Sequence, residues 1–523
     1  MAPLKVHIKH AGKKYDLELD PQKPPLAFKE TVYQLTGVPL DRMKVMVKGG
    51  VLKDDSDWEK IGPKEGQTFV AVGAAGELPQ PPSEPIKFLE DLNDTELADA
   101  LGMPVGLTNL GNTCYMSATI QALRAIPELQ TALSDSRELN PIARSLRDLY
   151  TSMAHSTGGV MPLAFFTVLR AAIPQFSERS RTGNSYAQQD AEECWTQLTN
   201  RLRDVPGVSA SGTSTSRTAF IDQYLTGTLV RTLSSPEAPD EPPSAVEENV
   251  SKVECNISGN TNFMISGIME ALNQTVVKHS PTLGREATYN SSARLSRLPS
   301  YLTIHMVRFT WRRDINKKAK IMRKVKFPTE FDALDIVTDK LREKMRPVSG
   351  KRIQIEQARD ERRKVRKRTR AAVPVTQSPS GDAGSATEAT GETPGGGDVE
   401  MSEPTTQQSV AGGELQPEEW YRAREKTELE ALIDPAIKAD VGASQTGLYD
   451  LVAIITHKGA AADSGHYIAF VARRALTGKE EDEDWLKFDD NKVSVFPSEK
   501  LTTLDGGGED SSAYVLLYKS KGL

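Results

Sequence analysis

The chain contains three cysteines, Cys114, Cys194 and Cys255, and none of them belongs to a CxxC pair. They are too few for a disulfide framework or a thiolate zinc site. Cys114 differs from the other two because it directly precedes a helical pattern of apolar residues that ends before Pro127. At a helix N-terminus, unpaired N–H groups and the helix dipole favour the thiolate, which is the nucleophilic form. Cys114 is therefore a candidate nucleophile, although on these grounds alone a buried structural cysteine is the commoner case.

A thiolate hydrolase also needs a group that protonates the leaving amine, and histidine titrates near neutrality. Of the seven histidines, His466 follows a loop of small residues and begins the apolar segment HYIAF. A side chain at the mouth of a strand can face a cleft. The others lie in the N-terminal module, in polar stretches or in the apolar segment 301–309, and His457 has no comparable setting. We therefore expect His466 to be the base.

Two further groups would complete such a site. The segment WLKFDDN is an alternating strand pattern that ends in Asp489, Asp490 and Asn491. We expect Asp489 to orient the imidazole, because its two neighbours point to other faces. For the oxyanion of a tetrahedral intermediate, the nearest donors in sequence are the Cys114 N–H and the side-chain amide of Asn109. Asn109 fits the role of a turn residue equally well.

The first 75 residues form a module of their own. Apolar residues alternate on both sides of the turn Ala11-Gly12, which predicts a β-hairpin over residues 4–19. Apolar residues at helical spacing follow over 28–35, with further strands at 44–48 and 68–72. The pattern indicates a mixed α+β module.

The rest of the chain divides at composition changes. Residues 76–100 begin with a stretch rich in proline, which predicts a semi-rigid linker. A large domain runs over 101–519, and it is interrupted by an insertion at about 345–415. The insertion holds a dense basic run, Arg362–Arg370, and then a Ser/Thr/Gly-rich sequence with little apolar surface to bury. We expect the insertion to be disordered.

Within the large domain, the segment SYAQQDAEE (185–193) predicts a helix. Ser185 and Gln188 form a capping-box pattern, and an apolar stripe continues beyond it. Asp190 lies off that stripe, so it is either a solvated helix residue or a binding residue.

Composition excludes some classes of function. The net charge is −6, with 38% hydrophobic and 26% charged residues, which is ordinary for a soluble protein and argues against nucleic-acid binding. The basic run Arg362–Arg370 lacks interleaved aromatic residues, so it reads as a solvated or targeting tail. No apolar run is long enough to span a bilayer, and the N-terminus lacks the apolar core of a signal peptide. We expect the protein not to associate with a membrane and to be cytoplasmic or nuclear.

Several of these segments together resemble the ubiquitin-specific protease family. The matching segments occur in order along the chain: GLTNLGNTCYMS (106–117), SYAQQDAEE (185–193), YLTIHMVRF (301–309), SGHYIAF (464–470) and KFDDNKVS (487–494). The module at 1–75 resembles ubiquitin, whose fold is the β-grasp. With this module at its N-terminus, the chain most resembles the proteasome-associated member of the family.

The resemblance implies an α+β protein: a β-grasp ubiquitin-like domain followed by a papain-like thumb–palm–fingers domain. It implies hydrolysis of the isopeptide bond after the Gly-Gly of ubiquitin. Cys114 would be the nucleophile, His466 the base and then the acid, Asp489 the orienting residue, and Asn109 an oxyanion donor. By the same resemblance, Gln188, Asp190 and Tyr467 would line the channel for the C-terminal tail of ubiquitin.

The resemblance also implies partners and limits. Partners would be ubiquitin, polyubiquitinated proteins and the proteasome regulatory particle, with the ubiquitin-like domain as the docking part. No cofactor is expected. No structural zinc is expected either, because relatives carry two CxxC pairs in the fingers and this chain has only Cys255 there. Loops near 310–321 and 457–465 would block the channel until a partner moves them. A non-catalytic ubiquitin-binding regulator and a protease for another ubiquitin-like modifier remain the alternatives.

Overall fold

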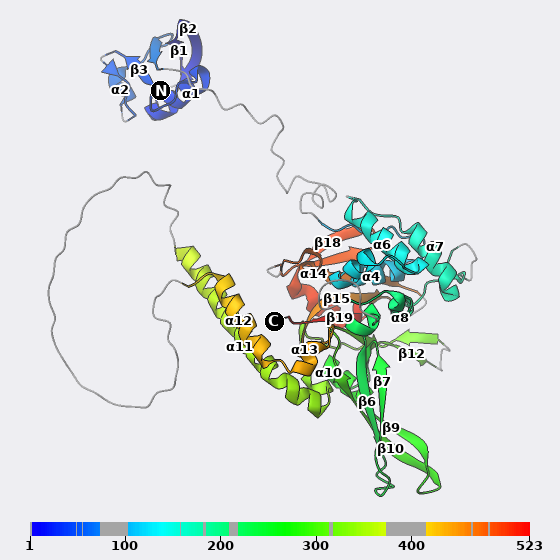
Figure 1. The fold of residues 1–523 in the computed structure, drawn as a ribbon. Coiled ribbons are helices and arrows are strands. Elements are labelled where there is room, and N and C mark those ends of the chain that lie inside the picture. Colours follow the sequence, from blue (N-terminus) through cyan, green and yellow to red (C-terminus); the bar gives the residue numbers. More distant parts are fainter. Residues whose placement is uncertain are drawn as a thin grey trace, which may run out of the picture. The chain divides into compact units, whose positions relative to one another are not determined.

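The computed structural model describes residues 3–48, 50–54, 56–73, 103–156, 158–180, 185–208, 218–312, 317–372, 415–461, 464–479 and 482–522. The chain divides into two compact units, Met1–Asn93 and Asp94–Leu523 (Figure 1). The linker expected at 76–100 lies outside the described residues. None of the helices in the described part combines the length and the apolar character that a bilayer crossing requires.

The first unit is a mixed five-stranded sheet with a helix packed on one face, which is the β-grasp arrangement. Its elements are β1 (Leu4–His10), β2 (Lys13–Leu19), α1 (Pro25–Thr36), β3 (Lys44–Val47), β4 (Gly50–Val51), α2 (Trp58–Ile61) and β5 (Thr68–Val72). The strand order is β2-β1-β5-β3-β4, with β1 antiparallel to β2 and parallel to β5. Helix α1 ends at Gly37, which has φ of 69° and so suits the left-handed position after a helix. The predicted hairpin, helix and returning strands are confirmed.

The second unit begins with a helical region, the thumb. Its elements are α4 (Cys114–Leu123), α5 (Pro127–Asp135), α6 (Pro141–Ala154), α7 (Leu163–Ala172), η2 (Pro174–Ser177), α8 (Ala191–Arg201), η3 (Leu202–Asp204) and α9 (Phe220–Tyr224). Every residue of α4 is buried, and its side chains share one hydrophobic core with α8 and with the inner strands of the palm. The predicted helix that starts at Cys114 is confirmed.

The palm is an eight-stranded sheet of order β18-β17-β16-β15-β19-β11-β8, with β14 paired to β15. Its strands are β8 (Val253–Asn256), β11 (Tyr301–Val307), β14 (Glu330–Asp332), β15 (Leu448–Lys458), β16 (His466–Ala472), β17 (Trp485–Asp489), β18 (Lys492–Phe496) and β19 (Ser512–Ser520). Shorter helices border it: η4 (Leu334–Ile336), α13 (Pro435–Ala439), α14 (Arg473–Thr477) and η5 (Ser498–Asp505). Because β16 and β17 pair antiparallel, the start of β16 and the end of β17 lie at the same edge of the sheet.

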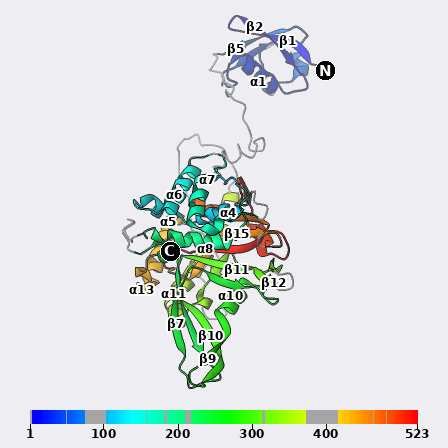
Figure 2. The same cartoon turned by 90° about the vertical axis from the view of Figure 1, so that its right-hand side faces the viewer.

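The fingers are a separate four-stranded sheet that extends away from the palm (Figure 2). They consist of β6 (Gly227–Ser234), β7 (Ser244–Val250), β9 (Asn273–Ser280) and β10 (Arg285–Arg297), with α10 (Met264–Leu272) packed at their base. A further two-stranded hairpin, β12 (Phe309–Arg312) and β13 (Lys317–Lys320), follows β11.

The insertion expected to be disordered over 345–415 contains a long helix instead. Helix α11 spans Asp339–Ala372 and runs beside α12 (Glu418–Leu432), as Figure 1 shows. Near the palm, α11 and α12 are held by apolar contacts within a second hydrophobic core, which also includes residues of the palm strands. The prediction was therefore wrong for residues 345–372, and residues 373–414 lie outside the described residues.

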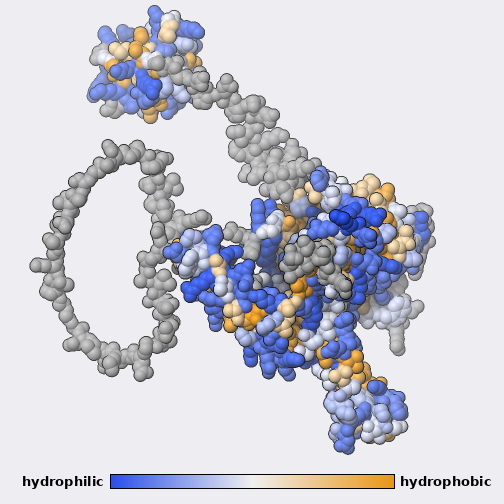
Figure 3. Space-filling view, in the orientation of Figure 1, coloured by the Kyte–Doolittle hydropathy of each residue, from blue (hydrophilic) through white to orange (hydrophobic). Residues whose placement is uncertain are grey.

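Ion pairs hold the distal part of these two helices together. Arg359 lies 2.8 Å from Glu425, and Arg362 lies 2.6 Å from Glu425 and 3.1 Å from Glu418. Arg366 also pairs with Glu418, at 2.8 Å. Part of the basic run is therefore neutralised within the chain instead of forming a free cationic tail. The visible surface of the helical pair is mostly hydrophilic, with apolar residues in small patches (Figure 3).

Candidate active site

Cys114 is the first residue of α4, directly after the N-cap Thr113. The N–H groups of a first helical turn have no partner within the helix, and they create a positive potential at the Cys114 sulfur. The residue is only 2% exposed. A substrate carbonyl must therefore reach the sulfur through a narrow opening or after a movement of the neighbouring segments.

His466 lies at the start of β16, and its imidazole is close enough to the Cys114 side chain for that side chain to be the main cause of its raised pKa. The other side of the ring faces Asp489 at the end of β17, with 2.6 Å between Nε2 and Oδ1. Since Nε2 faces the carboxylate, Nδ1 is the nitrogen left for the thiol. The two antiparallel strands thus bring a base and a carboxylate together at one sheet edge, beside the cysteine helix.

Neighbouring side chains shift the pKa values of both His466 and Asp489. The hydrogen bond with Cys114, and then that with Asp489, raise the pKa of His466 from 6.5 to about 9, against the opposing effect of burial. Burial tends to raise the pKa of Asp489, but hydrogen bonds from His466 and Lys487 outweigh it, so the net pKa is lowered. Near neutral pH, His466 is therefore an imidazolium that lies between the side chains of Cys114 and Asp489.

Asn109 lies in the turn before Cys114, and its amide orientation is fixed. Its Oδ1 accepts hydrogen bonds from Gly111 N at 2.8 Å, Thr113 N at 3.3 Å and Thr113 Oγ1 at 3.1 Å. Its Nδ2 is consequently directed outward and donates to Asp490 Oδ2 at 2.9 Å. An amide nitrogen carries two hydrogens, so one remains for an oxyanion. Asn109 thus serves as a turn residue, and one of its two Nδ2 hydrogens has no acceptor among the described residues.

Asp490, the neighbour of the expected orienting residue Asp489, also belongs to the site. It occupies the turn between β17 and β18 with φ of 53°, and its Oδ2 lies 4.0 Å from His466 Nε2. Burial raises the pKa of its carboxyl, against the hydrogen bond from Asn109 and the charge of His466. Gly106 makes this arrangement possible, because a Cβ there would lie 2.5 Å from the Asp490 carbonyl oxygen. The tandem DD followed by N, a typical two-residue hairpin turn, was the signal that could have located it.

The helix predicted from Ser185 begins later than expected. Helix α8 starts at Ala191, its N-cap is Asp190, and Ser185 and Gln188 lie in the non-helical chain before it. The predicted capping box was therefore wrong. Asp190 Oδ1 accepts from Glu192 N at 2.8 Å, which satisfies one free N–H of the first turn.

The three residues expected to bind the tail of ubiquitin lie in different settings. Asp190 also accepts a hydrogen bond from the Tyr514 hydroxyl, at 2.7 Å to Oδ2, and burial raises the pKa of its carboxyl. Tyr467 is 1% exposed and lies in the core below the site, with its ring 4.8 Å from that of His457. Gln188 is partly buried, and its Nε2 has no hydrogen-bond partner among the described residues.

The two loops expected to block the channel are joined to each other. Lys320 N, at the end of β13, donates to Ala460 O at 3.0 Å, and Ala319 forms an isolated bridge with Ala461. The Lys320 ammonium is buried and donates to the His457 carbonyl at 2.8 Å. The hairpin β12–β13 is therefore bonded to the loop that leads into His466.

Among the described residues, one group of side chains could hold a metal ion: His466, Asp489 and Asp490. The same atoms already bind one another, and an ion there would take His466 away from Asp489. Cys255, which the sequence analysis expected in the fingers, lies on β8 of the palm instead, and its buried thiol faces the Met264 carbonyl at 3.4 Å. In the described part of the chain, the finger strands β7, β6, β10 and β9 pair with one another in that order.

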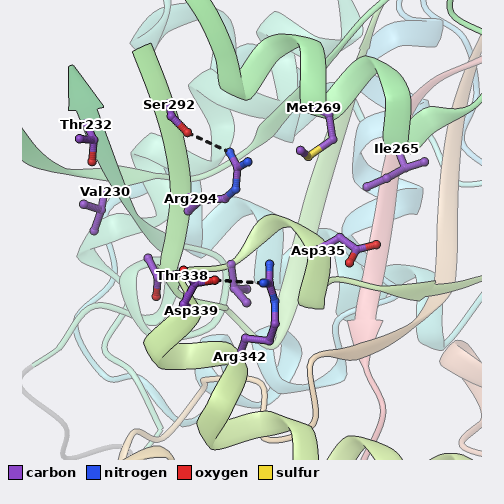
Figure 4. A pocket seen from close by; sticks show the side chains of 11 residues that line it. Val230, Thr232, Ile265, Met269, Ser292, Arg294, Asp335, Thr338, Asp339 and Arg342 are labelled. Atoms are coloured by element: carbon purple, nitrogen blue, oxygen red, sulfur yellow. Dashed lines mark hydrogen bonds and ion pairs between the residues drawn. The ribbon is translucent and has the colours of Figure 1, made fainter. Parts of the chain in front are cut away.

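A cavity of about 650 Å³ lies elsewhere, at the base of the fingers. Its walls come from β6, β10, α10 and the start of α11, with the side chains of Arg294 and Arg342 among them (Figure 4). Both arginines are already bonded within the protein, Arg294 to Asn273 Oδ1 and Arg342 to Asp339 Oδ1. No residue of the Cys114 site lines this cavity.

Two family models match the chain, and curated relatives match it over almost its whole length. The family model described as ubiquitin carboxyl-terminal hydrolase matches residues 105–518, and the model described as ubiquitin family matches residues 6–75. Ubiquitin carboxyl-terminal hydrolase 6 of Schizosaccharomyces pombe is 40% identical over 99% of this chain and 98% of its own length. Ubiquitin carboxyl-terminal hydrolase 6 of Arabidopsis thaliana is 36% identical over the same shares, and ubiquitin carboxyl-terminal hydrolase 14 of Caenorhabditis elegans is 28% identical over 99% and 93%.

Proposed function

The chain belongs to the ubiquitin carboxyl-terminal hydrolase family and is a deubiquitinating enzyme, and we propose that it acts on ubiquitin conjugates held by the proteasome. In this proposal Cys114 is the nucleophile, His466 the acid and base, Asp489 the orienting carboxylate and Asn109 an oxyanion donor. The observation that carries it is the position of His466, beside the Cys114 side chain on one side and 2.6 Å from Asp489 Oδ1 on the other.

The reaction follows from these positions. The Cys114 thiolate adds to the carbonyl carbon of the terminal glycine of ubiquitin, and the carbonyl oxygen becomes an oxyanion. His466 gives its proton to the lysine nitrogen as the C–N bond breaks, which leaves a thioester on Cys114 and a free amine. Water then gives a proton to His466 and adds to the thioester. Collapse of the second intermediate releases ubiquitin with a free carboxylate and regenerates the thiolate.

The proposed partner, the proteasome regulatory particle, is supported by a surface of the first unit. Met46 on β3 pairs in register with Val51 on β4 and Val70 on β5, and Lys44 pairs with Val72. Met46, Val51, Val70 and Val72 are each more than 40% exposed. Contiguous exposed apolar residues on a sheet face are typical of protein–protein contacts, so we propose that this face docks on the particle.

The burial of Cys114 supports a low resting activity. The residue is 2% exposed, and the two neighbouring loops are hydrogen bonded to each other. We propose that a partner which separates these loops opens the way to the sulfur. We also propose a cytoplasmic or nuclear location for the protein. All three cysteines are free thiols, which fits a reducing compartment.

The test is turnover of a fluorogenic amide of ubiquitin, with and without purified proteasomes. We expect weak turnover by the chain alone and strong stimulation by proteasomes. Met46→Asp and Val70→Asp should abolish the stimulation and leave the turnover of the free chain unchanged. Leu35→Asp, on the exposed side of α1, is the matched control and should behave as the wild type. Equal turnover in all samples would contradict the docking proposal while leaving the hydrolase intact.

A further inference from the structure

The turn before Cys114 has an uncommon backbone conformation. Gly111 has φ of 92° and Asn112 has φ of 54°, so two successive residues are in the left-handed region. Glycine and asparagine are the residues that enter this region most readily. The turn leads through Thr113 into the Cys114 N–H, so its conformation sets the direction of that N–H.

The turn is braced from two sides. On the inner side, Asn109 Oδ1 accepts the three hydrogen bonds from Gly111 and Thr113. On the outer side, Asn112 Nδ2 donates to the Tyr186 carbonyl oxygen at 2.9 Å. This second bond joins the turn to the chain segment before α8.

Tyr186 is itself held firmly. The Arg170 guanidinium carbon lies 3.7 Å from the centre of the Tyr186 ring, and the Arg179 guanidinium carbon lies 4.4 Å from it. Arg170 is 9% exposed, and its Nε and Nη2 have no hydrogen-bond partner among the described residues. A cation that is removed from water gains more from an aromatic face than an exposed one does. Arg179 also forms an isolated antiparallel bridge with Tyr186.

We infer that Asn112 is a positioning residue, which holds the turn against Tyr186 so that the Cys114 N–H points at the developing oxyanion. The inference rests on the proposed function and adds to it a residue that touches neither substrate nor Cys114 Sγ. The inference also gives a role to the buried Arg170. Its guanidinium stacks on the Tyr186 ring and thereby fixes the Tyr186 carbonyl, to which Asn112 donates.

A donor that acts on the oxyanion is needed in the transition state and not in the bound substrate. Loss of the brace should therefore lower kcat and leave KM unchanged. It should also weaken binding of a ubiquitin whose C-terminal carboxylate is replaced by an aldehyde, because that aldehyde forms a tetrahedral adduct with the cysteine.

The test uses the full chain with Asn112→Gly, since glycine keeps the left-handed backbone and removes only the amide. We expect kcat on the ubiquitin amide to fall about tenfold, KM to stay within about twofold of the wild type, and affinity for the aldehyde to fall by a factor similar to that of kcat. Arg170→Met acts at the other end of the brace and should change kcat in the same direction. Asn140→Gly is the matched control. It removes a partly buried amide whose Nδ2 donates to Arg201 O at 2.7 Å and whose Oδ1 caps α6. Glycine at an N-cap costs only a few tenths of a kcal/mol in stability, so this variant should have the kcat and KM of the wild type.

Wild-type kcat in Asn112→Gly would overturn the inference. A lower kcat without a matching loss of aldehyde affinity would also overturn it, and so would a change in KM alone. Each of these results would show that Asn112 does not act through stabilisation of the oxyanion. The proposed function is tested separately by the wild type: if the wild-type chain neither turns over the amide nor binds the aldehyde, the hydrolase assignment fails and not only the role of Asn112.

Discussion

Asn109 and Asp490 are 381 residues apart in the sequence, and a hydrogen bond of 2.9 Å joins Asn109 Nδ2 to Asp490 Oδ2. The bond connects the turn that precedes Cys114 to the turn that follows Asp489. The two ends of the catalytic unit are therefore fixed to each other, with the His466 imidazole between them at 4.0 Å from the Asp490 carboxylate.

The two neighbouring aspartates should differ in their effect on turnover. Asp489→Asn should lower kcat by about 10²-fold or more, because an amide stabilises the His466 imidazolium much less than a carboxylate does. Asp490→Asn should cost at most about tenfold, since the amide oxygen can still accept from Asn109. Steady-state kinetics on the ubiquitin amide measure both. Equal losses, or a larger loss in Asp490→Asn, would assign the orienting role to Asp490 instead.

The raised pKa of His466 predicts a pH dependence. Its pKa is about 9 in the folded protein, against 6.5 for a free imidazole, with the Cys114 hydrogen bond as the main cause. The protonated His466 ring therefore adds its full contribution to the free energy of unfolding below pH 6.5, and this contribution is lost as the pH rises through 9. Turnover should fall over the same alkaline range, because the leaving amine loses its acid. In NMR titrations, Cys114→Ala should lower the His466 pKa; an unchanged pKa would show that Cys114 does not contact the ring.

Asp190 can be tested without disturbing its helix. Asparagine caps a helix about as well as aspartate does, so Asp190→Asn keeps the bond to Glu192 N and removes only the charge. If Asp190 holds the basic tail of ubiquitin, KM should rise about tenfold, which is typical for a lost charged hydrogen bond, while kcat stays unchanged. An unchanged KM would restrict Asp190 to its role as N-cap and partner of Tyr514.

Glu425 should hold the α11–α12 pair together. It is 8% exposed and accepts from both Arg359 and Arg362, so Glu425→Ala leaves two cations close together without their shared anion. We expect a local destabilisation of about 1–3 kcal/mol, seen as faster hydrogen exchange in α12. Glu430→Ala on the same helix is the control and should change exchange little, because its partly exposed carboxylate lies 4.0 Å from Lys438. Equal exchange in both variants would show that the ion pairs do not hold the helices.

Local patterns in the sequence located the main elements of the site. Cys114 at a helix start, His466 at a strand start and Asp489 at a strand end each follow from the residues on either side, and the structure has all three in these places. Positions that depend on distant partners were not accessible in this way. Asp490 is placed by the close approach of Gly106, far away in the chain.

The same reason explains the two errors of secondary structure. The pattern at Ser185 and Gln188 satisfies a local capping rule, but Tyr186 is bridged to Arg179, so this stretch cannot be helical. Helix α11 has too few apolar residues in its distal half for a helical period to be visible. Its partners there are Glu418 and Glu425, more than fifty residues further along the chain.

The most direct test of the site is the reaction of the full chain with ubiquitin that carries an electrophile at its C-terminus, followed by mass spectrometry of the labelled peptide. We expect one adduct, on Cys114, that is absent in Cys114→Ala and slower to form in His466→Ala. An adduct on Cys194 or Cys255, or labelling that persists in Cys114→Ala, would contradict the assignment of Cys114 and His466 as the reacting pair.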